Sequence, residues 1–286
     1  MLILRADAMG MCFGVRDALA ATEQVERPDQ VTMHGELVHN GEVLARLDAR
    51  GFQRSPERAR AVPDTPVVLI TAHGVSDRER ARLAAAGKQI LDTTCPLVRR
   101  AHEAAQQLER EGRRVIVIGR ADHVEVRGIV EDLNQPVVVT GPEQVQRWPE
   151  ARLGVVCQTT TPDERVAATF AAICAANAHA DVRLIDTVCN PTKARGRALE
   201  ELLPRIDALV VVGGRDSNNT RKLAERGRAR GVPTCHVESE RELDPAWFEG
   251  CCTVGLTAGT STLPETIERV HAWLCRLAAR TPLRAS

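Results

Sequence analysis

Short runs of β-branched and aliphatic residues, each followed by a polar loop and then by a helix-like segment, recur along this chain. These runs occupy residues 31–33, 67–71, 115–119, 153–156, 209–212 and 252–256. Continuous apolar strands that alternate with helices are typical of parallel sheets covered by helices on both faces. A length of 286 residues suits more than one such sheet. We therefore predict an α/β fold made of small parallel sheets.

Composition and charge exclude several classes of protein. Lys plus Arg (38) balance Asp plus Glu (38), and aromatic residues make up 2% of the chain, so neither a basic field nor a base-stacking platform favours nucleic-acid binding. The apolar runs fall far short of the ~18 residues that a membrane-spanning helix needs. The first seven residues lack the basic start of a secretory signal and are typical of a short strand. We expect a cytoplasmic protein without nucleic-acid or membrane partners.

Three cysteines have similar sequence surroundings. Cys12, Cys95 and Cys189 each follow a strand-like run, precede a helical pattern, and have a basic residue four positions later. The second and third share the pattern Asp-Thr-x-Cys, and the three cysteines divide the chain into similar lengths. An internal repeat of this kind predicts three α/β modules. We expect them to comprise residues 13–94, residues 95–188, and residues 1–12 together with 189–286.

The repeated cysteines suggest a metal site. The nine cysteines form no Cys-x-x-Cys pair, so a metal would need ligands from distant segments. A thiolate at a strand-to-helix turn is stabilised by the helix N-terminus and a nearby cation. Three thiolates would leave one open coordination position, on zinc or on a cubic iron-sulfur cluster; the alternative is three buried structural thiols. The other six cysteines are interpreted as core residues: Cys157, Cys174, Cys235, Cys251, Cys252 and Cys275.

Histidines follow three of the predicted strands. His39, His73 and His123 each open a turn there, where imidazoles and helix N-termini together can bind an anion such as a diphosphate. Ser217, Asn219 and Ser261 would add neutral donors. The alternatives are solvated surface histidines and ordinary helix caps. No glycine-rich nucleotide-binding motif is present.

Glu125 is a candidate proton donor. It follows His123 by two residues, in a loop at a strand end. A carboxyl group needs a raised pKa to donate a proton near neutral pH, and burial would provide it. The alternative is an exposed carboxylate without a role.

Motifs along most of the chain resemble those of one enzyme family. In chain order these motifs are Gly10-Met11-Cys12-Phe13-Gly14-Val15, Val38-His39-Asn40, Ala72-His73-Gly74-Val75, Asp92-Thr93-Thr94-Cys95-Pro96, His123-Val124-Glu125-Val126, Gln158-Thr159-Thr160, Asp186-Thr187-Val188-Cys189, Ser217-Asn218-Asn219 and Thr257-Ala258-Gly259-Thr260-Ser261. Between about residues 8 and 264 their order is similar to that in the 4-hydroxy-3-methylbut-2-enyl diphosphate reductases, the LytB family, which catalyse the last step of the non-mevalonate isoprenoid pathway.

The resemblance implies a fold, a cofactor and roles for residues. The fold would be three small parallel-sheet α/β modules in a pseudo-threefold trefoil around a central [4Fe-4S] cluster. Cys12, Cys95 and Cys189 would hold that cluster and leave one iron open to the substrate hydroxyl. Glu125 would supply protons, with Thr159 and His123 in its relay, and electrons would come from a ferredoxin or flavodoxin. The substrate would be held by His39, His73, His123, Thr159, Ser217, Asn218, Asn219 and Ser261.

Four departures from the family pattern keep other functions open. Asp122-His123-Val124-Glu125 stands where the family commonly has Gly-His-Pro-Glu, and Asn218 replaces the middle serine of Ser-Ser-Asn. One extra residue separates Ser261 from Pro264, and Asn190-Pro191-Thr192-Lys193 differs from the typical run after the third cysteine. A paralogue acting on another allylic diphosphate is therefore one alternative. The others are a zinc hydrolase using the three cysteines and an iron-sulfur sensor without turnover.

Overall fold

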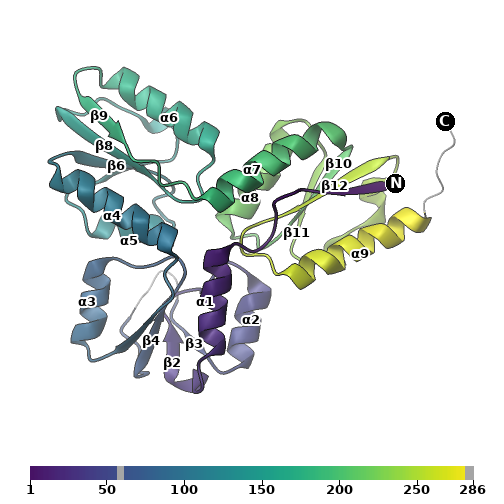
Figure 1. Ribbon diagram of the computed structural model, residues 1–286, viewed down its shortest axis with the longest axis horizontal. Coiled ribbons are helices and arrows are strands. Elements are labelled where there is room, and N and C mark those ends of the chain that lie inside the picture. The colour runs from purple at the N-terminus through teal and green to yellow at the C-terminus, as the bar shows by residue number, and fades with distance from the viewer. Residues whose placement is uncertain (57–60, 281–286) are drawn as a thin grey trace. The chain divides into compact units, whose positions relative to one another are not determined.

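The computed structural model describes residues 1–56 and 61–280. The chain folds into two compact units. Of the described residues, unit 1 contains 1–13, 39–43 and 190–280, and unit 2 contains 14–38, 44–56 and 61–189. Figure 1 labels the elements. No helix in the described ranges is both long and apolar enough to cross a membrane.

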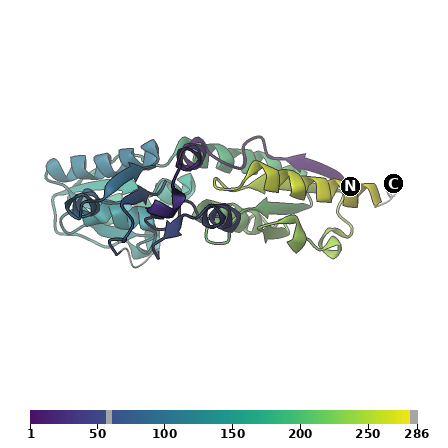
Figure 2. The same ribbon diagram turned by 90° about the horizontal axis from the view of Figure 1, so that it is seen from below.

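Unit 1 is built on one four-stranded parallel sheet. Its strands lie in the order β1 (Leu2–Arg5), β12 (Thr253–Ala258), β10 (Ala208–Val212) and β11 (Thr234–Val237). Helices α7 (Asn190–Leu202) and α8 (Asn218–Ala229) pack on one face, and α9 (Pro264–Arg280) packs on the other and lies alongside β1 (Figures 1 and 2). Alternate residues of β10 explain this arrangement: Val210 is buried in the cluster with α9, and Leu209 in the cluster with α7 and α8.

Unit 2 contains two four-stranded parallel sheets. The first has the order β3 (Gln53–Arg54), β2 (Val31–Met33), β4 (Val67–Ile70) and β5 (Gln89–Asp92). The second has the order β7 (Val137–Val139), β6 (Arg114–Ile118), β8 (Arg152–Cys157) and β9 (Asp181–Leu184). The helices between these strands are α1 (Phe13–Glu23), α2 (Gly41–Ala49), α3 (Asp77–Ala85), α4 (Pro96–Arg110), α5 (Val124–Glu131) and α6 (Asp163–Ala176).

The second sheet of unit 2 is covered on both faces. Val115 and Val117 of β6 pack in a cluster with α4 and α5, whereas Ile116 and Ile118 pack in a cluster with α6. Figure 1 shows α4 and α5 on one side of these strands and α6 on the other. A strand buried on both faces needs apolar residues at every position, which is why the sequence of β6 is a continuous apolar run.

The predicted α/β class with parallel sheets is confirmed. Each predicted apolar run forms a strand, with ends that differ by at most two residues. The three sheets have the same chain order: two central strands (β10 and β12, β2 and β4, β6 and β8) lie between a strand that precedes a cysteine (β1, β5, β9) and one further edge strand. The three sheets therefore share one strand arrangement.

Candidate functional site

The predicted site residues follow equivalent strands in the three sheets. His39, His123 and Ser217 follow one central strand of each sheet, and His73, Thr159 and Ser261 follow the other. Chain order reverses between these two strands, and in open α/β sheets ligands bind beyond the carboxyl ends of the strands at such switch points. Each sheet therefore presents its candidate residues where its topology favours a ligand.

The three cysteines share one backbone arrangement. The N–H group of Cys12 donates to the Thr260 carbonyl at 3.0 Å, that of Cys95 to Ala72 at 3.1 Å, and that of Cys189 to Thr159 at 2.9 Å. In each case the accepting residue lies two positions beyond the neighbouring central strand. Helices α1, α4 and α7 begin at the next residue. The repeat that the sequence shows around these cysteines is thus also a repeat of hydrogen bonds.

The three thiols lie at equivalent positions. All three are partly exposed, and each directly precedes the first residue of a helix. Gly14 lies against the second thiol: a Cβ atom there would be 2.5 Å from Cys95 Sγ, so a larger residue would displace the sulfur. Within the described residues of this ligand-free structure, no three Cys, His, Asp or Glu side chains form a ready metal-binding group.

Glu125 is buried and contacts Thr159. Its carboxylate accepts from Thr159 N at 2.6 Å and from the Thr159 hydroxyl at 3.0 Å, and the residue is 2% exposed. Burial raises the pKa of Glu125 to about 7, outweighing the two Thr159 hydrogen bonds, which lower it. The interpretation of Glu125 as an exposed carboxylate is therefore wrong. A carboxyl group with this pKa can both hold and release a proton at neutral pH.

His123 caps the helix that carries Glu125. Its Nδ1 atom accepts from Glu125 N at 3.2 Å, so the neutral imidazole has its proton on Nε2. The His73 ring packs edge-on against the His123 ring, with 5.7 Å between centroids. Two of the three predicted histidines thus lie together beside the buried acid in unit 2.

The remaining predicted residues gather in unit 1. The Ser261 hydroxyl donates to the His39 carbonyl at 3.3 Å, and the side-chain oxygen of Asn219 accepts from Thr260 N at 3.1 Å. Ser217 caps α8 by accepting from Thr220 N. Ser217, Asn218 and Asn219 are each buried at the first turn of α8. The group combines hydroxyl and amide donors with a helix N-terminus, a combination suited to an anion.

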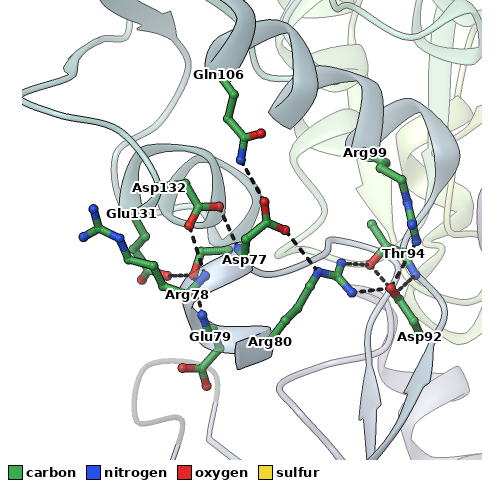
Figure 3. A network of polar contacts seen from close by, with 11 residues as sticks. Asp77, Arg78, Glu79, Arg80, Asp92, Thr94, Arg99, Gln106, Glu131 and Asp132 are labelled. Carbon is green, nitrogen blue, oxygen red and sulfur yellow. Dashed lines mark hydrogen bonds and ion pairs between the residues drawn. The ribbon is translucent and has the colours of Figure 1, made fainter. Parts of the chain in front are cut away.

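The turn that carries Cys95 is stabilised by charged groups (Figure 3). Asp92 accepts from both Thr94 N, at 2.9 Å, and Arg99 Nη2, at 3.1 Å, and it forms a short ion pair with Arg80. Burial raises the pKa of Asp92, but the Thr94 hydrogen bonds and the Arg80 charge outweigh it and hold that pKa below its ordinary value. At the start of α3, Asp132, the residue after α5, accepts from Asp77 N at 2.7 Å. This network links α3, α5 and the Cys95 turn.

Two further polar residues, Asn40 and Gln158, form hydrogen bonds beside the predicted site residues. Asn40 caps α2 by accepting from Val43 N at 3.1 Å, and it donates to the Ser261 carbonyl at 2.8 Å. Gln158 is 1% exposed and accepts from Arg120 N at 3.1 Å. Both stand in motifs next to predicted site residues. A polar residue directly after an apolar strand is the only sequence signal for Gln158, and it is equally typical of a simple cap; Asn40 stands further along the loop after β2, beside His39.

The core interpretation of the other cysteines is correct for some and wrong for others. Cys157 is buried, and Cys235 and Cys251 pack against the core of unit 1. Cys252 and Cys275 are exposed. Cys252 comes just before β12 begins, and Cys275 lies on the outer face of α9, so strand or helix patterns alone did not separate inward from outward positions.

The architecture and these residues define a class of protein: three parallel-sheet α/β modules with a buried acid and with imidazole, hydroxyl and amide groups at the strand ends. The model of the LytB protein family matches residues 3–275, and the chain belongs to this family. Membership implies an oxidoreductase with an iron-sulfur cofactor.

Relatives cover nearly the whole chain. A 4-hydroxy-3-methylbut-2-enyl diphosphate reductase of Anaeromyxobacter is 38% identical over 94% of this chain and 97% of its own length, and one of Aquifex aeolicus is 33% identical over 94% of each. A solved structure of such a reductase, described as the terminal enzyme of the non-mevalonate pathway, is 31% identical with a TM-score of 0.68, covering 96% of this chain and all of that one. The Plasmodium falciparum reductase structure has a TM-score of 0.88 at 24% identity over 96% of this chain and 87% of its own, which supports the fold.

Proposed function

We propose that this protein is a 4-hydroxy-3-methylbut-2-enyl diphosphate reductase. It removes the allylic hydroxyl group with two electrons and two protons, releases water, and forms isopentenyl and dimethylallyl diphosphate. The observation that carries the proposal is Glu125, a fully buried carboxyl group with a pKa of about 7, in a chain that matches the LytB family from residue 3 to residue 275. An acid is required at this place because the departing hydroxyl leaves as water only if it gains a proton.

The cofactor in this proposal is a [4Fe-4S] cluster held by Cys12, Cys95 and Cys189. When bound, it supplies the electrons and a Lewis-acidic iron without a cysteine ligand. The partial exposure of the thiols, their positions at helix N-termini and the close approach of Gly14 to the Cys95 sulfur support this assignment. The boundaries of the three modules, at residues 13, 95 and 189, stay a prediction from the internal sequence repeat.

Glu125 provides protons for the reaction. One proton leaves with the hydroxyl group as water, and the second is added to carbon of the allyl group, so the charge of the two electrons is balanced. The hydroxyl group of Thr159, 3.0 Å from the carboxylate, orients Glu125 and connects it to the substrate oxygen. The Nε2–H group of His123 is the matching donor on the other side of the relay.

The diphosphate is bound by groups at the carboxyl ends of the strands. His39, His73 and His123 offer imidazole donors, and Ser217, Asn218, Asn219 and Ser261 offer hydroxyl and amide donors. The Ser217 hydroxyl accepts from Thr220 N and so still has its own proton to donate to an anion. Neutral and histidine donors together explain how a chain with no excess of Lys and Arg can bind a strongly negative ligand.

The electron donor in this proposal is a separate ferredoxin or flavodoxin, because the sequence has no nucleotide-binding motif of its own. The reaction would take place in the cytoplasm, where reduced donors of this kind occur.

An anaerobic assay tests the function directly. Purified protein, 4-hydroxy-3-methylbut-2-enyl diphosphate and a reduced dye should give dye oxidation and both products, and the protein should be brown with iron and sulfide. Cys95→Ser should lose the cluster, whereas Cys252→Ser, at an exposed position, should keep it. A colourless protein that binds only zinc, or a brown protein without turnover, would contradict the proposal.

A further inference from the structure

A buried arginine connects the two chain segments next to the first and third cysteines. Arg195 lies on α7, six residues after Cys189, and is 6% exposed. Its Nε atom donates to the Gly10 carbonyl at 3.0 Å, and its Nη2 atom makes a second, short hydrogen bond to the same oxygen. Its Nη1 atom donates to the Pro191 carbonyl at 2.8 Å. Gly10 precedes Cys12 by two residues, and Pro191 follows Cys189 by two.

The internal repeat shows that this arginine is not needed for packing. The residue six positions after the cysteine is Ala18 on α1 and Ala101 on α4, which are 1% and 0% exposed. An alanine at this position is therefore enough to pack a helix of this module. α7 alone has a long cationic side chain there, and a buried cation is costly unless its hydrogen bonds are satisfied. The satisfied bonds include those to Gly10 and Pro191.

Gly10 is itself held in a restricted conformation. Its φ is +73°, and a Cβ atom at this position would lie 2.6 Å from Ile267 Cδ1. Its N–H group donates to the Ala258 carbonyl at 3.0 Å, and two residues later Cys12 N donates to Thr260. Because the last residue of β12 and the loop after it accept the N–H groups of Gly10 and Cys12, and Arg195 donates to the Gly10 carbonyl, the direction of the turn before Cys12 is set from both sides.

We infer that Arg195 is a positioning residue for the cofactor: it fixes the turn that presents Cys12 and the start of the helix after Cys189. This inference rests on the proposed function, in which both cysteines are ligands. Residues that orient metal ligands through hydrogen bonds commonly change metal affinity about 10- to 100-fold when they are replaced. A fixed positive charge near the ligands also favours the reduced, more negative state of an iron-sulfur centre.

Two variants separate the geometric effect from the charge. In Arg195→Lys the charge remains, but one ammonium group cannot reproduce the two-sided contact with both carbonyls. In Arg195→Gln both are lost. We expect both variants to release iron to a chelator about 10- to 100-fold faster than the wild type. Only the Gln variant should shift the midpoint potential to more negative values, and both should have altered EPR spectra in the reduced state.

Arg113 provides a matched control. It is also buried, and it donates to the Leu153 carbonyl at 3.2 Å and the Asp181 carbonyl at 2.9 Å, at the amino ends of the strands and away from the cysteine turns. Arg113→Gln should lower the melting temperature while leaving the iron-release rate, the EPR spectrum and the potential unchanged.

The outcomes decide between the two proposals. Wild-type release rates and spectra in Arg195→Gln, or equal changes in the Arg113 control, would overturn the positioning role. If Arg195→Gln fails to fold, the Lys variant decides alone: unchanged iron release and an unchanged spectrum would refute the inference. Wild-type protein that binds no cluster would instead contradict the proposed function.

Discussion

The two cysteine turns of unit 2 have the same backbone and different side-chain support. In Asp92-Thr93-Thr94-Cys95 and Asp186-Thr187-Val188-Cys189, the aspartate accepts from the N–H group two residues later, at 2.9 Å and 3.0 Å. The first threonine of each turn donates its hydroxyl to a carbonyl of the neighbouring strand, Ile70 and Cys157 respectively. The shared Asp and Thr residues therefore make the hydrogen bonds that define the turn.

The third residue separates the two turns. Thr94 donates its hydroxyl to Asp92 and accepts from Arg80 at 3.0 Å, within a partly exposed network of charges. Val188 is 6% exposed and packs into the apolar cluster with β6, β8 and α6. The module with the apolar turn is also the one that buries Glu125, since the Thr159 carbonyl accepts from Cys189 N and Thr159 donates to Glu125. The same backbone turn therefore lies in a partly exposed network of charges at Cys95, and beside an apolar cluster and the buried Glu125 at Cys189.

The largest effect expected from this difference is on catalysis. Glu125→Gln removes the proton but keeps the shape of the side chain, so turnover should fall at least ~100-fold while iron content stays at the wild-type level. Glu131→Gln, on the exposed end of the same helix, is the control and should leave turnover nearly unchanged. Dye-linked anaerobic rates measure both variants. A Gln variant with normal turnover would remove Glu125 from the mechanism.

The two modules should respond to pH in opposite directions. The pKa of Glu125 is raised on folding, so its contribution to stability is complete below 4.5 and is lost as pH rises through about 7. That difference corresponds to about 3 kcal/mol. The pKa of Asp92 is lowered on folding, so its contribution is present above 3.8 and is lost as pH falls below that value.

Denaturant unfolding between pH 3 and pH 8 measures this contrast. Glu125→Gln should flatten the change between pH 4.5 and pH 7, and Asp92→Asn should flatten the change at acid pH. If both variants kept the full pH dependence of the wild type, other groups would be responsible for it.

Exchanging the third residue of the turns tests the comparison itself. Val188→Thr places a hydroxyl group in an apolar cluster and should lower the free energy of unfolding by about 1–3 kcal/mol. Thr94→Val removes a hydroxyl that bonds Asp92 and Arg80, and it should cost about 1–2 kcal/mol. The double-exchange variant should show nearly additive losses, because the turns lie on different sheets. A stabilising Val188→Thr change would show that the polarity of this position is not decisive.

The smallest effect is expected from Arg99. Its side chain is 54% exposed, and an exposed ion pair with Asp92 contributes little. Arg99→Met should lower the free energy of unfolding by less than about 1 kcal/mol, and 1 M NaCl should abolish the difference. A larger loss that persisted in high salt would mean that Arg99 acts through packing.

Much of the fold could be predicted from local patterns. The runs at residues 67–71 and 115–119 form β4 and β6, and the strand, turn and helix around each cysteine follow the predicted order. Continuous apolar runs predicted parallel sheets because only strands covered on both faces tolerate them. Cys252 and Cys275 show the limit: both occur in regular patterns, yet both are exposed. Pattern and period describe an element, but the surface that it presents depends on its neighbours.

Residue types and their spacing alone determined that this chain forms three similar α/β modules and that cysteines, histidines and Glu125 stand where strands end. Only the tertiary structure decided that Glu125 has a pKa of about 7, because that value depends on the side chains that exclude water around it. It also decided that Arg195 reaches Gly10 across 185 positions of sequence. Hydrogen bonds and burial between distant segments follow from packing, so no local pattern could predict them.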